Sequence, residues 1–122
     1  MPGEFALVDL IRARVRLRPD VACGIGDDAA VLHVPAGQAL VVTSDTLVSG
    51  VHFPPDTAPA DIGWKALAVN LSDLAAMAAT PAWCTLALTL PTADAEWLEQ
   101  FLDGFLALAD ERGRKLLVPA NR

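Results

Sequence analysis

Apolar residues recur at helical spacing in three parts of the chain. Residues 4–14 place Phe5, Leu7, Val8 and Ile11 near one face, which predicts a short first helix. The stretch Ile62–Ala79 is rich in Ala, Leu and Met, so we expect a helix packed over most of its surface, with Asp61 as its N-cap. A second long helix is expected over Ala95–Arg112, ahead of Gly113, with a buried stripe formed by Trp97, Leu98, Phe101, Leu102, Phe105 and Leu106.

Shorter apolar runs predict strands. Ala29–Val34 and Ala39–Thr43 flank "PAGQ", a typical turn sequence, and residues 80–91 form a third run. A fourth strand begins in "RKLLV" near the end of the chain. Helices and strands are mixed without regular βαβ order, so the fold class we expect is α+β. Its architecture would be a mostly antiparallel sheet backed by the two long helices, in a single domain over residues 1–122.

The composition narrows the classes of function. The chain has 122 residues, of which 53% are hydrophobic and 20% charged, as in one globular domain. A net charge of −6 argues against nucleic acid as a partner and would repel an anionic substrate unless bound cations reverse the local sign. Cys23 and Cys84 lie far apart without CxxC spacing, which favours reduced, buried thiols over a disulfide or zinc site.

The N-terminal residues and the lengths of the apolar runs indicate where in the cell the protein is located. Glu4 and Asp9 interrupt the N-terminal residues, so we expect no signal peptide. No apolar stretch approaches the roughly 20 residues that cross a bilayer. We therefore expect a cytoplasmic protein that uses neither a membrane nor nucleic acid as partner.

Two acidic stretches suggest a cation site. In "CGIGDDAAVL" (residues 23–32) Asp27 and Asp28 are adjacent, an arrangement that costs energy unless water, a base or a cation offsets the charge. In "VVTSDTLVSGVHF" (residues 41–53) Thr43, Ser44 and Asp45 offer hard oxygen ligands of the kind that magnesium prefers. An Asp-rich turn and a capped strand end are the structural alternatives for these two stretches.

A third carboxylate, Asp73, stands on a helix otherwise lined with Ala, Leu and Val, so it must be exposed, paired or a ligand. Asn70 is three residues earlier, on the same face. No His or Cys spacing indicates zinc or iron, so any metal is expected to be magnesium-like.

A few other residues have two interpretations. His52, in a loop beside Gly50 and Pro54, is either structural or a ligand contact. Lys65 and Trp64 could touch substrate, but surface and core roles, respectively, fit them better. The sequence has no GxxxxGK[ST], GxGxxG or GxSxG motif. A phosphate-binding patch and a solvated face both remain open for Arg12, Arg14, Arg16 and Arg18.

Five segments together resemble one known family. They are "GEF", "GIGDDAAVL", "TSDTLVSGVHF", "KALAVNLSDLAAMAATPAW" and "LALTLP". In this order they closely resemble the N-terminal half of the bacterial thiamine-monophosphate kinase family, within the aminoimidazole ribonucleotide synthetase superfamily. The resemblance runs from about residue 3 to residue 118. It implies transfer of the γ-phosphoryl group of ATP to thiamine monophosphate, with magnesium ions between the phosphates and a set of acidic residues.

The resemblance also implies roles for single residues. Asp28 matches a magnesium ligand, with Asp27 as a weaker candidate. Thr43, Ser44 and Asp45 match the second metal-binding stretch, Asp73 matches the helical carboxylate, and His52 matches a residue that contacts the thiamine substrate. The family would use no acid–base dyad, since phosphoryl transfer needs chiefly positioning and charge neutralisation. Divalent cations would then offset the repulsion between the adjacent carboxylates.

The chain departs from the family pattern at its C-terminus. The family continues with Gly-Gly-Asp-Thr and a second domain, whereas this sequence has Pro119–Arg122. We expect a truncated form that lacks the C-terminal domain. Two alternatives remain: a catalytically inactive dimerisation module, since the superfamily domain forms homodimers through its sheet, and a sibling ATP-dependent synthetase, which the "GVHF" and "NLSD" segments disfavour.

Overall fold

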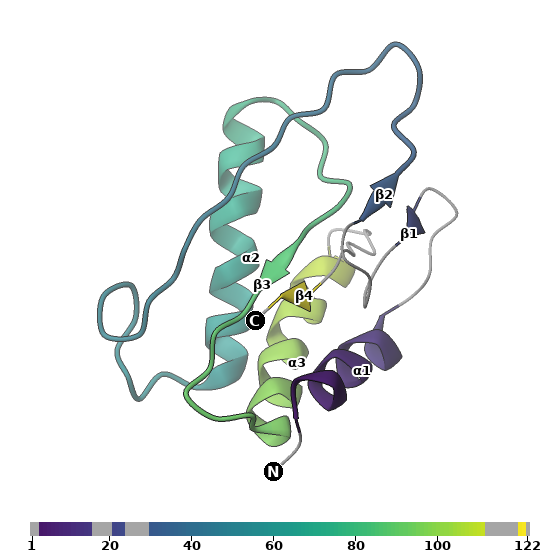
Figure 1. The fold of residues 1–122 in the computed structure, drawn as a ribbon. Helices are drawn as coiled ribbons and strands as arrows, with labels where there is room; N and C mark the ends of the chain where they lie inside the picture. Colours follow the sequence, from purple (N-terminus) through teal and green to yellow (C-terminus); the bar gives the residue numbers. More distant parts are fainter. Residues whose placement is uncertain (1–2, 16–20, 24–29, 112–119, 122) are drawn as a thin grey trace. The chain divides into compact units, whose positions relative to one another are not determined.

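The computed structural model describes residues 3–15, 21–23, 30–111 and 120–121 (Figure 1). The chain divides into two compact units. The first unit comprises Met1–Leu40, Ala82–Ala95 and Lys115–Arg122, and the second comprises Val41–Pro81 and Glu96–Arg114. Most of the predicted site residues belong to the second unit.

The first unit contains the predicted N-terminal helix, α1 (Glu4–Arg14). Ile11 is buried and Leu7 and Val8 are partly buried, so the apolar face predicted for this helix is confirmed at these positions. Arg12 donates to the Asp9 carboxylate at 3.1 Å, with both side chains exposed. This pair fits the solvated-face interpretation for Arg12, while Arg16 and Arg18 lie outside the described residues.

Strands of the first unit form two small sheets. β1 (Val21–Cys23) pairs antiparallel with β2 (Val31–Leu32), and β3 (Leu86–Ala87) pairs parallel with β4 (Ala120–Asn121). Helices and strands coexist as the α+β class requires. In the described part of the chain, however, the strands do not form the single, mostly antiparallel sheet that we expected.

The strand predictions over-estimated the length of regular structure. The predicted strand Ala39–Thr43 has no regular secondary structure. The predicted turn at "PAGQ" is present, with the Gln38 N–H donating to the Pro35 carbonyl at 3.3 Å. Within the strand predicted at residues 80–91, the structure has a strand over two residues, β3. Apolar, β-branched sequence favours a strand only where a partner strand completes the hydrogen bonds. Composition alone therefore misplaced these elements.

Cys84, next to β3, carries a thiol rather than a disulfide sulfur, as we expected. Burial raises the pKa of its thiol to about 12. A thiol with this pKa stays protonated near neutral pH and is a poor nucleophile or metal ligand. The side chain of Cys23 lies outside the described residues.

The second unit is built on two helices, α2 (Pro59–Ala76) and α3 (Ala95–Glu111). Asp61 is not the N-cap of α2: Ala58 occupies that position, Pro59 opens the helix, and Asp61 lies in the first turn. Proline suits this first position because its missing N–H would have no intrahelical partner there. The helix ends at Ala76 rather than Ala79, and Ala78 adopts a φ of 55° that does not continue it.

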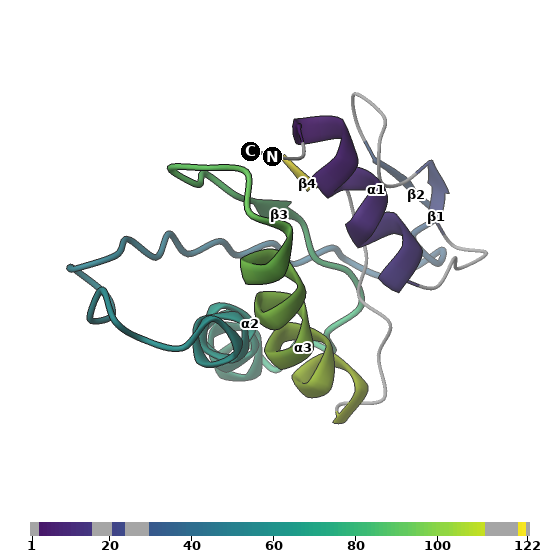
Figure 2. The same cartoon turned by 90° about the horizontal axis from the view of Figure 1, so that it is seen from below.

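α2 and α3 pack side by side (Figures 1 and 2), and two glycines allow their close approach. A Cβ atom at Gly63 would overlap with the Phe101 carbonyl, and one at Gly104 would overlap with the Ala60 carbonyl. The predicted stripe of α3 is buried at four of its six positions, and Trp97 stacks on Phe101 with ring centroids 5.3 Å apart. The buried residues of the two helices are Ile62, Gly63, Leu67, Leu71, Leu98, Phe101, Leu102, Gly104, Phe105, Leu108 and Ala109.

Trp64 is not a core residue, since 40% of its surface is exposed. Among the helices in the described ranges, none combines the length and the apolar character needed to span a membrane.

Candidate functional site

The candidate site combines helix α2 with residues 41–53, which have little regular structure and are called the extended segment below. Thr43, Ser44 and Asp45 lie on the extended segment, with Thr43 partly buried and the other two exposed. Asp73 is exposed on α2, near the end of that helix. Both parts belong to the second compact unit.

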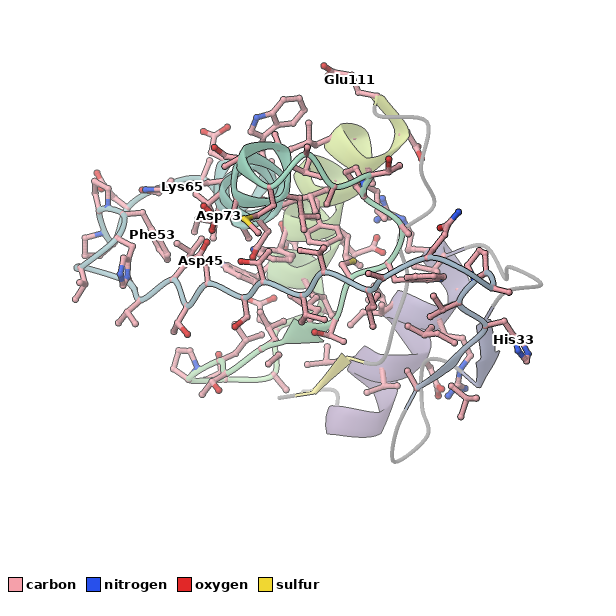
Figure 3. The ribbon with its side chains drawn as sticks, turned by 90° about the horizontal axis from the view of Figure 1, so that it is seen from above. His33, Asp45, Phe53, Lys65, Asp73 and Glu111 are labelled. Atoms are coloured by element: carbon pink, nitrogen blue, oxygen red, sulfur yellow. The ribbon has the colours of Figure 1, made fainter. Side chains whose placement is uncertain are left out.

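Asp45 and Asp73 lie close together beside α2 (Figure 3). A hydrogen bond between the two side chains raises the pKa of Asp45 above its ordinary value of 3.8. Desolvation and the negative charge of Asp73 act in the same direction, whereas the neighbouring His52 lowers the pKa. A hydrogen bond between two carboxyl groups requires a shared proton. Once that proton leaves, two negative charges face each other and a cation can take its place.

The donor set fits a hard dication. Magnesium requires only one or two carboxylates and fills its other positions with hydroxyls, water or phosphate. Asp45 and Asp73 supply that number, and Thr43 and Ser44 precede Asp45 directly. No cluster of three or more His, Cys, Asp or Glu side chains suited to a metal occurs within residues 3–15, 21–23, 30–111 and 120–121. Asp27 and Asp28 lie outside those ranges, so their predicted roles stay predictions.

Asn70 adds a polar group to α2 one turn before Asp73. Its Nδ2 donates to the Ala66 carbonyl at 2.8 Å, which fixes the orientation of the amide. Its Oδ1 is buried and has no hydrogen-bond donor in the described part of the chain. A buried acceptor of this kind is uncommon, because an unmade hydrogen bond costs free energy. Asn70 and Asp73 are three residues apart on α2, a spacing that makes them neighbours on the helix surface.

His52 is held in a loop with two defined contacts. The Val48 N–H donates to its Nδ1 at 2.8 Å. The Lys65 ammonium donates to its carbonyl oxygen from α2. Lys65 has the predicted surface position, but this contact was missed, because nothing in the local sequence links it to a loop residue. His52 also lies near enough to Asp45 to influence the pKa of that carboxyl group.

Comparison with known proteins gives one family and several close relatives. Residues 26–118 match the family described as AIR synthase related protein, N-terminal domain. The chain is 56% identical over 116 residues to thiamine-monophosphate kinase of Salmonella typhimurium, covering 94% of this chain and 36% of that protein. It is 62% identical over 81 residues to the Synechococcus elongatus protein of the same name, covering 65% of this chain and 25% of that protein.

Solved structures agree with the sequence comparisons. The crystal structure of thiamine-monophosphate kinase from Stenotrophomonas maltophilia K279a is similar with a TM-score of 0.81 and 61% identity, over 98% of this chain and 38% of that chain. The structure of thiamine monophosphate kinase from Aquifex aeolicus gives a TM-score of 0.63 and 32% identity. The chain spans about 36% of the length of the Salmonella relative.

Proposed function

The chain belongs to the AIR synthase related proteins, matching their N-terminal domain, and from this premise we propose that it is the ATP- and magnesium-binding domain of a thiamine-monophosphate kinase. Such an enzyme transfers a phosphoryl group from ATP to thiamine monophosphate and forms thiamine diphosphate and ADP. The names of its relatives support this activity. The observation that carries the proposal is the close approach of Asp45 and Asp73, two carboxyl groups from distant parts of the sequence.

We propose that Asp45 and Asp73 hold magnesium, with Thr43 and Ser44 supplying further oxygen ligands and Asp28 and Asp27 completing the acidic set. Bound magnesium would neutralise phosphate charge and attract ATP to a protein whose net charge is −6. His52 would contact thiamine monophosphate. The exposed position of Asp45, Asp73 and His52 is consistent with access for large anionic ligands.

The side chains of the site would promote phosphoryl transfer by orienting the bound ligands. Phosphoryl transfer proceeds through a transition state in which positioning and charge stabilisation provide most of the catalysis. Asp73 is fixed by a packed helix, and the close approach of Asp45 brings the extended segment to the same place. No residue in this proposal serves as a general acid or base.

We further propose that residues 1–122 form one N-terminal domain and that this domain associates as a homodimer. Exposed apolar side chains along and beside the extended segment support the homodimer: Leu40, Val41, Val42, Val48 and Val51. A partner strand would turn the predicted strand Ala39–Thr43 into part of a sheet. The use of ATP supports a cytoplasmic location.

Isothermal titration of the chain with ATP, with and without magnesium, tests the proposal. We expect binding that needs magnesium and that Asp45→Asn or Asp73→Asn weakens at least tenfold. Asp56→Asn, which removes an exposed carboxylate elsewhere in the second unit, serves as the matched control and should leave binding unchanged. Absence of nucleotide binding, together with a stable dimer in light scattering, would favour the non-catalytic dimerisation module.

A further inference from the structure

The loop that carries His52 is closed by its own backbone. The Val51 and His52 N–H groups donate to the Val48 carbonyl at 3.0 and 2.9 Å, and the Gly50 N–H donates to the Phe53 carbonyl at 2.8 Å. Gly50 has a φ of +80°, a conformation that suits glycine. The loop therefore keeps a compact shape of its own, although Val48 and Val51 are exposed.

The hydrogen bond to the His52 ring fixes its tautomer. A backbone N–H can donate only to a ring nitrogen that carries no proton. Because the Val48 N–H donates to Nδ1, the proton of the neutral imidazole is on Nε2. The free edge of the ring thus presents an N–H donor rather than an acceptor.

Lys65 ties this loop to the helix that carries Asp73. Its ammonium group donates to the His52 carbonyl, and Figure 3 shows Lys65 extending from α2 toward the loop of Phe53. Lys65 and Asp73 are about two helical turns apart on α2. One helix thereby locates the carboxylate directly and the imidazole through Lys65. The influence of both Asp73 and His52 on Asp45 places the three side chains in one neighbourhood.

We propose that Lys65 is a positioning residue that holds the His52 loop on α2, so that the Nε2–H of His52 donates a hydrogen bond to an acceptor atom of the bound substrate. The identity of that substrate, thiamine monophosphate, rests on the proposed function. The tautomer of His52 and the role of Lys65 rest on the contacts of the loop.

Nitrogen-15 NMR of the histidine-labelled chain tests the tautomer. The spectrum is recorded at about pH 8.5, above the ordinary histidine pKa of about 6.5. His33→Gln identifies the His52 signals by removing the other histidine. We expect His52 to show an unprotonated Nδ1 and a protonated Nε2. A protonated Nδ1, or fast averaging between the two forms, would overturn the assigned donor.

Lys65→Met tests the positioning role, because it removes the donor and keeps an unbranched stem. We expect changed ring and loop-amide signals for His52, and about tenfold weaker binding of thiamine monophosphate in the presence of magnesium. The unfolding midpoint should move little, since Lys65 is exposed. Lys65→Arg should restore both the signals and the affinity. Arg12→Met, which removes an exposed cation in the first unit, should alter neither.

Unchanged His52 signals in Lys65→Met would overturn the positioning role, whatever the ligand data. If the unmodified chain fails to bind thiamine monophosphate while Lys65→Met still displaces the His52 signals and Lys65→Arg restores them, the positioning role stands and the proposed substrate is wrong. The two proposals therefore fail in different measurements.

Discussion

The helix pair α2–α3 and the extended segment 41–53 contribute to the same unit in opposite ways. The helices bury apolar side chains and approach each other through Gly63 and Gly104. The segment leaves most of its side chains exposed, and its regular structure is limited to an isolated bridge between Ser49 and Phe53. The helices supply stability, while the segment supplies polar groups. Asp45 with Asp73, and His52 with Lys65, are the contacts that bring the two together.

The largest effect is expected where the helices meet. In Gly63→Ala the new Cβ would overlap with the Phe101 carbonyl and lie 3.0 Å from the Phe105 nitrogen, so the helices would have to separate. We expect a loss of more than about 4 kcal/mol in the free energy of unfolding, measured by urea denaturation. Gly3→Ala is the control, because nothing lies within 4 Å of a Cβ at that position. A well-folded Gly63→Ala chain of normal stability would show that the helix crossing is not close.

A core truncation should follow in size. Leu98 on α3 is 0% exposed, and Leu98→Ala is expected to cost about 3 kcal/mol through lost burial and the resulting cavity. Val42 on the extended segment is 79% exposed, so Val42→Ala should change the stability of the monomer by less than about 0.5 kcal/mol. Equal losses from both variants would remove the distinction between a buried helix pair and an exposed segment.

Magnesium should stabilise the chain through the contact between the two regions. At a magnesium concentration of about 100 times Kd, binding to the folded state alone contributes about 2.7 kcal/mol, seen as a rise in the unfolding midpoint. Asp73→Asn removes the helical carboxylate, and a tenfold loss of affinity at the same magnesium concentration should cut this stabilisation to about 1.4 kcal/mol or less. Asp56→Asn should retain the full rise. An undiminished rise in Asp73→Asn would place the cation elsewhere.

The smallest effect concerns pH. The pKa of Asp45 is raised in the folded chain, so the folded state holds the proton more tightly than the unfolded state. The resulting stabilisation is complete below 3.8 and is lost as pH rises through the higher, folded-state pKa. Without magnesium, we therefore expect stability to fall slightly over this range, and Asp45→Asn to flatten that dependence in chemical denaturation. A steeper dependence in Asp45→Asn would contradict the assignment.

The sequence was a good guide to the helices. The pattern of apolar residues predicted α1 with its observed bounds and α3 to within one residue at its C-terminal end, because helical periodicity is a local property. The sequence pattern misplaces the start of α2, because it predicts Asp61 as the N-cap, whereas the helix begins at Pro59. Ala39–Thr43 failed as a strand because strand formation depends on a partner that local composition does not specify.

The site was predictable by residue type but not by contact. The residue types of Asp45, Asp73 and His52 point to chemistry, and the structure brings the side chains of Asp45 and Asp73 close together. Their roles as ligands stay predictions. The contact of Lys65 with the His52 carbonyl was not foreseen, since it depends on how a loop folds back onto α2. A surface lysine gives no sequence signal for such a contact.

The central claim is that Asp45 and Asp73 act as one cation-binding pair, and a double-mutant cycle on magnesium affinity tests it most directly. Titration calorimetry of the unmodified chain, Asp45→Asn, Asp73→Asn and the double variant gives the four affinities. If the pair acts as a unit, each single variant should lose at least tenfold in affinity and the double variant should lose little more. Unchanged affinity in either single variant, or losses that simply add, would contradict a shared site.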